Sequence, residues 1–157
     1  MNKLSDTDFA QVIRNAPLIS VDLLVEDGDG RFLLGLRTNA PAKGYWFVPG
    51  GRIYKNERMA EALIRIGKTE LGVDLNLVMC RFFGLYEHFY VDNAFSQEFG
   101  THYVVAAFSL KVENLQSLPK QQHSAYRWLL PDEILSDPKV HLHTRDYFLG
   151  SSEALGK

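Results

Sequence analysis

The sequence has little of several features that define other classes of protein. Its 157 residues include one cysteine, Cys80, so an internal disulfide and a cysteine-cluster metal site are excluded. A lone thiol is typical of a reducing compartment, and we expect a cytoplasmic protein. The longest apolar run, residues 103–108, is far shorter than the roughly 20 residues that span a bilayer. Residues 1–10 lack the apolar stretch of a secretory signal. We therefore expect no membrane association.

The sequence also has no large excess of positive or negative charge. The 19 acidic and 17 basic side chains give a formal net charge of -2, and no basic cluster stands out. Because nucleic-acid binding requires a basic patch, we expect no nucleic-acid partner. With 46% hydrophobic and 23% charged residues, the composition is that of a globular protein. We expect residues 1–157 to form a single domain with its own core.

Apolar periodicity, turns and caps predict strands and helices in mixed order, which indicates an α+β fold. Asp27-Gly28-Asp29-Gly30 has the composition of a hairpin turn. Pro49-Gly50-Gly51 reads as a break after a short strand. The predicted helices cover residues 5–15, 56–71, a short stretch from Pro131, and 144–149; the predicted strands cover residues 18–26, 31–37, 45–48, 79–92, 101–112 and 126–130.

The interior helix over residues 56–71 is the clearest element. Asn56 is a plausible N-cap and Gly72 stands where a C-cap glycine belongs. Gly67 falls inside this helix, where glycine costs about 1 kcal/mol relative to alanine. We therefore expect a close packing contact at Gly67.

A glycine loop leads directly into this helix. Glycine leaves the backbone unobstructed, so a carbonyl such as that of Gly50 can approach a ligand or an ion closely. Carboxylates one turn along the helix can meet the same ion. Magnesium suits such a site because it takes oxygen ligands and commonly bridges to substrate phosphates.

The residues of this loop and helix resemble the Nudix hydrolase family, whose signature is G-x5-E-x7-R-E-U-x-E-E-x-G-U, with U aliphatic. The resemblance implies a Nudix-like α/β/α sandwich with a mixed sheet and a central catalytic helix. The alternative is an amphipathic helix with a solvated charged face, in which Glu61 and Arg65 form an i,i+4 pair. The residues that match the signature at its spacing are Gly51, Glu57, Arg65, Glu70, Gly72 and Val73.

Two departures from the signature affect the chemistry. The family has acids at three helix positions that here hold Ile66, Thr69 and Glu70. These positions share one helix face, which therefore has one carboxylate in place of three. One acid with a carbonyl holds a single magnesium, and neither Ile66 nor Thr69 can activate water.

The degenerate signature and several other segments together resemble the GDP-mannose mannosyl hydrolases, a Nudix subfamily. The segments are GYWFVPGG at 44–51, EHFY at 87–90, THYVV at 101–105, QH at 122–123 and YRWL at 126–129. The resemblance implies hydrolysis of GDP-mannose, and of GDP-glucose, to GDP and free hexose. Water attacks the anomeric carbon with inversion, and one Mg²⁺ lies on the diphosphate. A homodimer is implied as well.

By this resemblance, Gly50 (through its carbonyl), Glu70 and Gln122 are the magnesium ligands, and all three are oxygen donors. His123 is the general base, since an imidazole near neutrality accepts a proton from water. An exposed loop histidine is the plain alternative for His123. Arg37 and Arg52 neutralise charge on departing GDP, as guanidinium groups do for phosphate; as ordinary surface charges they would have no such role.

The remaining implied residues bind substrate. Asp22, His88 and Tyr103 face the sugar or the diphosphate, although each also fits an ordinary place in a strand. Phe9 and Leu4 contact the nucleotide, although Phe9 also fits the core of the first helix.

Two other functions stay open. An ordinary Nudix diphosphohydrolase would attack phosphorus and release a nucleoside monophosphate with a sugar phosphate. A non-catalytic nucleotide-sugar sensor would keep binding without chemistry. Loss of the acids at 66 and 69 disfavours the first, and retention of Glu70, Gln122 and His123 together argues against the second.

Overall fold

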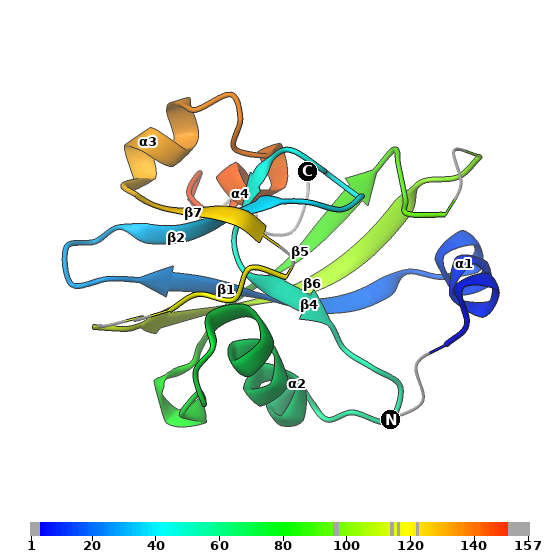
Figure 1. Cartoon of the computed structure of the whole chain (residues 1–157), viewed down its shortest axis with the longest axis horizontal. Coiled ribbons are helices and arrows are strands. Elements are labelled where there is room, and N and C mark those ends of the chain that lie inside the picture. Colours follow the sequence, from blue (N-terminus) through cyan, green and yellow to red (C-terminus); the bar gives the residue numbers. More distant parts are fainter. Residues whose placement is uncertain (1–3, 96–97, 114, 116, 122, 151–157) are drawn as a thin grey trace.

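A computed structural model describes residues 4–95, 98–113, 115, 117–121 and 123–150. Its elements form one mixed seven-stranded sheet with helices on both faces, which confirms the predicted α+β sandwich (Figure 1). The elements are α1 (Asp6–Asn15), β1 (Leu18–Glu26), β2 (Phe32–Arg37), β3 (Trp46–Phe47), β4 (Gly50–Arg52), α2 (Met59–Ile66), a π-helical turn (Gly67–Leu71), a 3-10 turn (Leu77–Met79), β5 (Arg81–Tyr90), β6 (Thr101–Lys111), β7 (His123–Leu129), α3 (Pro131–Ser136) and α4 (Leu142–Asp146).

Strand β1 is the centre of the sheet and changes partner along one of its edges. It pairs in parallel with β6 over its whole length, and β5 pairs antiparallel with β6. On its other edge, Glu26 lies opposite Phe32 of β2, whereas Asp22 lies opposite Gly50 of β4. Strand β2 diverges from β1 and pairs with β3 and β7. The sheet is therefore divided, and residues from both halves face one another across the division.

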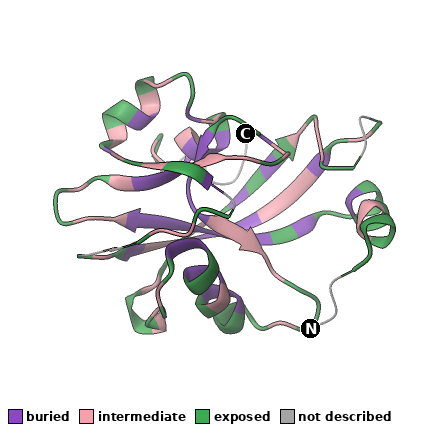
Figure 2. Ribbon diagram, viewed as in Figure 1, coloured by how far each residue is buried: buried purple, intermediate pink, exposed green. Residues whose placement is uncertain are grey.

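Alternation along β1 supplies the core on both faces of the sheet. Leu24 is buried on the face opposite α2, against Phe47 and Tyr147. A third cluster packs α3 against β2 and β7. Figure 2 shows α2 buried only on its sheet-facing side, as its amphipathic sequence predicts. The cluster that joins β1 to α2 contains Val21, Leu23, Val25, Ala62, Leu63 and Ile66.

The first helix and the two hairpins form as predicted. Helix α1 begins after Ser5, whose hydroxyl accepts a hydrogen bond from the Asp8 amide at 3.1 Å. Strands β1 and β2 flank the predicted glycine turn, and β5 and β6 form the long antiparallel hairpin. No helix in the described ranges is both long and apolar enough to cross a membrane.

The predicted break at Pro49-Gly50-Gly51 is only partly right: Val48 and Pro49 separate β3 from β4, but Gly50–Arg52 forms strand β4. Gly50 fits against β1 only because it has no side chain: an added Cβ would collide with Asp22 Oδ1 and the Val21 carbonyl. Gly51 faces the other way, where an added Cβ would lie 3.2 Å from Ile66. The two glycines therefore let β1 and α2 approach the same short strand.

The interior helix differs from the prediction at both ends. Asn56 is not the N-cap: it has a φ of 66°, which asparagine tolerates, and the helix starts at Met59 after Arg58. The last turn, Gly67–Leu71, is π-helical, and Gly72 ends it with a φ of 72°. An added Cβ at Gly67 would collide with Leu75, so the predicted close contact is confirmed.

Two later boundaries also differ. The strand predicted from residue 126 already begins at His123, because β2 offers partners as far as Arg37, which lies opposite His123. His123 is therefore the first residue of β7 and not part of a loop. The last helix is α4 (Leu142–Asp146), which starts two residues and ends three residues earlier than predicted, with the His141 side chain accepting from the His143 amide at its N-terminus.

Candidate active site

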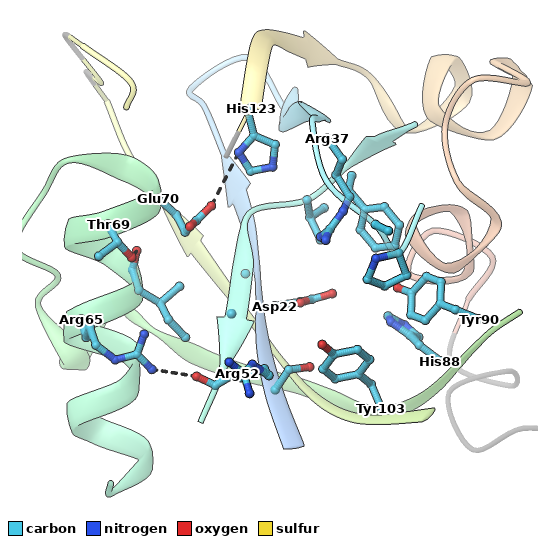
Figure 3. A pocket seen from close by; sticks show the side chains of 18 of the residues that line it. Asp22, Arg37, Arg52, Arg65, Thr69, Glu70, His88, Tyr90, Tyr103 and His123 are labelled. Carbon is cyan, nitrogen blue, oxygen red and sulfur yellow. Dashed lines mark hydrogen bonds and ion pairs between the residues drawn. The ribbon is translucent and has the colours of Figure 1, made fainter. Parts of the chain in front are cut away.

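A cavity of about 280 Å³ lies at the division of the sheet, bounded by the end of α2 on one side and by β5 and β6 on the other (Figure 3). Both halves of the sheet contribute to it, as do the π-helical turn and α1. Its ionisable and phenolic lining residues are Asp22, Glu70, Arg37, Arg52, Arg65, His88, His123, Tyr54, Tyr90 and Tyr103.

The cavity residues of α2 and the π-helical turn, Arg65, Ile66, Thr69 and Glu70, form what we call the helix wall. Glu70 is the one carboxylate among them. It lies in the π-helical turn with 2% of its surface exposed. Burial raises the pKa of Glu70 to about 7, and the nearby Arg37 opposes this rise only in part. Ile66 is fully buried beside Gly51, and the Thr69 hydroxyl donates to the Ile66 carbonyl at 3.3 Å. Neither neighbour can supply a second acid.

Arg65 ties the helix to the glycine strand. Its Nε donates to Glu57 Oε1 at 2.6 Å, and its Nη2 donates to the Arg52 carbonyl at 2.7 Å. Glu61 instead accepts from the Arg58 amide at 2.8 Å and caps the helix. Arg65 therefore pairs with Glu57, and not with Glu61 as an i,i+4 pair on a solvated helix face would require.

His123 faces Glu70 across the cavity, with 3.6 Å between its Nδ1 and Glu70 Oε2. It is 4% exposed, and burial, together with Arg37, lowers the pKa of His123 to about 4. At neutral pH the imidazole is therefore uncharged, so its contact with Glu70 is not an ion pair and it can accept a proton. An added Cβ at Gly35 would collide with the His123 ring, which fixes the ring beside β2.

Arg37 and Arg52 give the cavity its positive charge. The Nε atom of Arg37 is buried and has no hydrogen-bond partner in the described residues. The Arg52 guanidinium carbon lies 3.7 Å above the centre of the Phe9 ring. A buried guanidinium nitrogen without a partner is costly unless an acceptor binds, which favours an anionic ligand here.

Asp22 of β1, His88 and Tyr90 of β5 and Tyr103 of β6 form the opposite side of the cavity, which we call the sheet wall. Asp22 and His88 have a hydrogen-bond partner within the protein. The Tyr147 hydroxyl donates to Asp22 Oδ2 at 2.6 Å and lies 3.3 Å from His88 Nε2. Burial raises the pKa of Asp22 to about 6, although the Tyr147 hydrogen bond and Arg37 lower it. Burial also lowers the pKa of His88 to about 2, with His143 and His141 adding to the effect.

The structure brings together most of the residues singled out in the sequence. Leu4 is not among the cavity residues; it is half exposed and precedes α1. Gln122 lies outside the described residues. The predicted site residues that do line the cavity are Phe9, Asp22, Arg37, Gly50, Arg52, Glu70, His88, Tyr103 and His123.

Gly35, Tyr90 and Tyr147 are among the residues at or next to the site that the sequence analysis did not assign to it. Gly35 interrupts the apolar strand β2, and an isolated glycine in a strand often marks a close approach, so this signal was available. Tyr90 lines the cavity but lies in an aromatic stretch that resembles core. Tyr147 lies 125 residues from its partner Asp22, and nothing local in the sequence indicates that contact.

The donor set fits a hard divalent cation. Glu70 is a buried carboxylate whose pKa is raised further by the charge of Asp22, and a cation would offset both charges. Gly50 presents backbone without a side chain opposite Asp22. Within the described residues there is no cluster of three or more His, Cys, Asp or Glu that could hold a metal. Coordination beyond Glu70 would come from other oxygen donors, such as a backbone carbonyl, a side-chain amide, water and the substrate.

A mixed sheet in which a glycine strand leads into a helix with a buried glutamate defines a Nudix-type fold. The family model described as NUDIX domain matches residues 16–149, and the chain belongs to this family. It is a Nudix hydrolase, and enzymes of this family generally use a divalent metal such as Mg²⁺.

Several individual proteins are similar. The "Low-salt glycan biosynthesis protein Agl8" of Haloferax volcanii is 36% identical over 129 residues, covering 82% of this chain and 81% of the relative. The MutT protein of Methanosarcina mazei superposes with a TM-score of 0.70 at 24% identity, covering 85% and 92% of the two chains. The MutT NUDIX hydrolase of Burkholderia pseudomallei gives 0.67 at 25% identity, covering 85% and 97%.

Proposed function

We propose that this Nudix hydrolase converts GDP-mannose, and GDP-glucose, to GDP and free hexose by attack of water on the anomeric carbon with inversion. The observation that carries the proposal is the composition of the helix wall. Glu70 is the single carboxylate there, and the adjacent proton acceptor is the neutral, buried imidazole of His123.

The base must come from outside the helix. Ile66 has no proton acceptor, and the Thr69 hydroxyl is engaged with backbone. His123 is uncharged over the physiological range because its pKa lies at about 4. Its position against Gly35 holds the ring in one place. An acceptor fixed in this way can take a proton from water as the water attacks carbon.

The leaving group is GDP, whose negative charge increases as the bond to the sugar breaks. Gly50, Glu70 and, by the resemblance, Gln122 would hold one Mg²⁺, which when bound neutralises diphosphate oxygens. Arg37 and Arg52 donate hydrogen bonds to the same oxygens. The unpartnered Nε of Arg37 supports this role, since an acceptor at that point removes the cost of its burial.

The sugar lies against the opposite wall in this proposal, where Asp22 and His88 face the cavity. The Haloferax relative is named as a glycan biosynthesis protein, which agrees with a substrate that carries a sugar. The homodimer implied by the resemblance belongs to the same proposal, and sedimentation of the full chain tests it.

Product identification tests the proposed reaction. With GDP-mannose and Mg²⁺ we expect GDP and free mannose, and proton NMR in the first minutes should show the anomer opposite to that of the substrate. GMP with mannose 1-phosphate would mean attack at phosphorus. Binding without turnover would mean a sensor. Either result would overturn the proposal.

A substitution of His123 tests its role as the general base. His123→Gln should lower turnover by about a hundredfold, the usual scale for a general base, and leave GDP affinity unchanged. His102→Gln is the matched control, because His102 stacks on Phe89 outside the cavity. Full activity of His123→Gln would exclude the histidine as the base.

A further inference from the structure

Tyr147 joins two residues of the sheet wall from a distant part of the chain. It follows α4 and is 3% exposed. Its hydroxyl lies 2.6 Å from Asp22 Oδ2 and 3.3 Å from His88 Nε2. Asp22 and His88 both line the cavity and are labelled in Figure 3, whereas Tyr147 is not among the lining residues.

The Tyr147 hydroxyl has one proton, which determines the direction of its hydrogen bonds with Asp22 and His88. An ionised carboxylate accepts hydrogen bonds and donates none, so the short contact has the Tyr147 proton directed at Asp22. The hydroxyl oxygen can then only accept from His88, which requires the proton of the neutral imidazole to be on Nε2. The lone pair of His88 is therefore on Nδ1.

The ring of His88 is also held from the other side. His143 stacks on it with 4.3 Å between the ring centres and 7° between the planes. His143 is itself anchored by its Nε2, which lies 3.0 Å from the Phe89 carbonyl. The position and the tautomer of His88 thus depend on two residues of the C-terminal helix region.

We propose that Tyr147 is a positioning residue, whose hydroxyl holds Asp22 and His88 as two hydrogen-bond acceptors for the hydroxyl groups of the sugar. The inference rests on the proposed function, because it takes the ligand of this wall to be a sugar. Asp22 keeps Oδ1, which Gly50 leaves clear, and His88 keeps Nδ1. Hydroxyl groups donate to such acceptors, whereas diphosphate oxygens carry no proton and are repelled.

This wall thereby orients the substrate. Arg37 and Arg52 provide only donors and attract the diphosphate, while Asp22 and His88 provide acceptors and exclude it. A nucleotide sugar can then bind productively in one direction. Loss of the Tyr147 hydroxyl would remove the acceptor of the Nε2 proton and free the His88 ring to take the other tautomer, in which Nδ1 is a donor.

Tyr147→Phe tests this assignment because it removes the hydroxyl and keeps the ring, which packs edge-on against Tyr86 at 4.6 Å. We expect kcat/KM for GDP-mannose to fall by about 10- to 100-fold, the scale of a hydrogen bond to a charged group, while the inhibition constant of GDP changes by less than about twofold. Tyr86→Phe is the matched control, a buried tyrosine outside the cavity. Equal losses for GDP and GDP-mannose, or no loss, would overturn the assignment.

A second measurement needs no activity. Nitrogen-15 NMR of the His88 ring, assigned with His88→Gln, should show Nε2 protonated in the parent and in Tyr147→Phe a mixture of both tautomers. An unchanged single tautomer would contradict the role of Tyr147. Because this signal is independent of which bond is cleaved, it distinguishes failure of the inference from failure of the proposed reaction.

Discussion

Each of the two walls of the cavity contains a buried carboxylate, and the two carboxylates differ in their partners. On the sheet wall, Asp22 accepts a 2.6 Å hydrogen bond from Tyr147. On the helix wall, Glu70 faces an uncharged His123 across 3.6 Å, beyond the length of a hydrogen bond. Burial raises the pKa of both carboxyls, to about 6 for Asp22 and about 7 for Glu70.

This difference indicates what each wall binds. A carboxylate already held by a protein donor is oriented to accept a further hydrogen bond from an organic ligand. A buried carboxylate without such a donor is costly to ionise, and a cation that binds it recovers that cost. In the proposed reaction an ion would complete the helix wall, whereas Asp22 on the sheet wall already has a donor within the folded chain.

Removal of the charge on the helix wall should have the largest effect. Glu70→Gln keeps the shape and loses the charge that a divalent ion requires, so turnover at limiting Mg²⁺ should fall by roughly a thousandfold, equivalent to several kcal/mol. A magnesium titration of activity checks this. Glu61→Gln is the control, because Glu61 caps the same helix outside the cavity. Normal magnesium dependence in Glu70→Gln would remove Glu70 from the ligand set.

In the metal-free protein, the burial of Glu70 should make the free energy of unfolding depend on pH. Because its pKa rises from 4.5 to about 7 on folding, the folded state holds the proton more tightly, and stability is lost as the pH rises through that interval. Relative to Glu70→Gln, we expect the parent to lose about 3 kcal/mol between about pH 4.5 and pH 8.

Urea unfolding in a chelator measures this difference, and taking it between the two proteins cancels the opposite contributions of the buried histidines. Added Mg²⁺ should restore the stability of the parent at high pH and leave Glu70→Gln unaffected. A difference that stays constant with pH would contradict the raised pKa of Glu70.

Gly35→Ala should disturb the base without touching the helix wall's carboxylate. The added Cβ collides with the His123 ring, and a displacement of about 1 Å costs roughly a hundredfold in turnover. Steady-state kinetics check the loss, and Gly28→Ala is the control, since nothing lies within 4 Å of its Cβ in the β1–β2 turn. Unchanged turnover in Gly35→Ala would mean that the position of His123 is unimportant.

The smallest effect should come from Phe9, whose ring carries the Arg52 guanidinium at 3.7 Å. Phe9→Leu removes the ring face, and we expect affinity for GDP to weaken by less than about 1 kcal/mol. Calorimetric titration with GDP measures the change, and Val12→Ala on the same helix is the control. A loss larger than that of Arg52→Gln would show that Phe9 contacts the nucleotide itself.

Local patterns in the sequence predicted much of the fold. The Ser5 cap, the glycine turn between β1 and β2, the Gly72 helix end and the packing of Gly67 all depend on residues close together in the chain. The π-helical turn was not predicted, because a five-residue segment is too short for apolar spacing to distinguish a π-helical from an α-helical turn. The strand at Gly50–Arg52 was missed because glycines favour a break unless a neighbouring strand requires close approach.

For the site, the signature spacing predicted Glu70 and its lost neighbours, but not the contacts that determine their chemistry. The start of β7 at His123 depends on how far β2 extends as a pairing partner, up to Arg37. The Tyr147–Asp22 hydrogen bond depends on the docking of α4 against the far face of the sheet. Such contacts arise from tertiary packing, which local sequence patterns do not encode.

The position of a solvent oxygen in the products tests the central claim most directly. Hydrolysis of GDP-mannose in oxygen-18 water, followed by mass spectrometry of both products, identifies the atom that water attacks. If His123 activates water toward carbon while the helix wall only holds the ion, the label will appear in the hexose and GDP will be unlabelled. Label in a phosphate of either product would mean attack at phosphorus and would contradict the account.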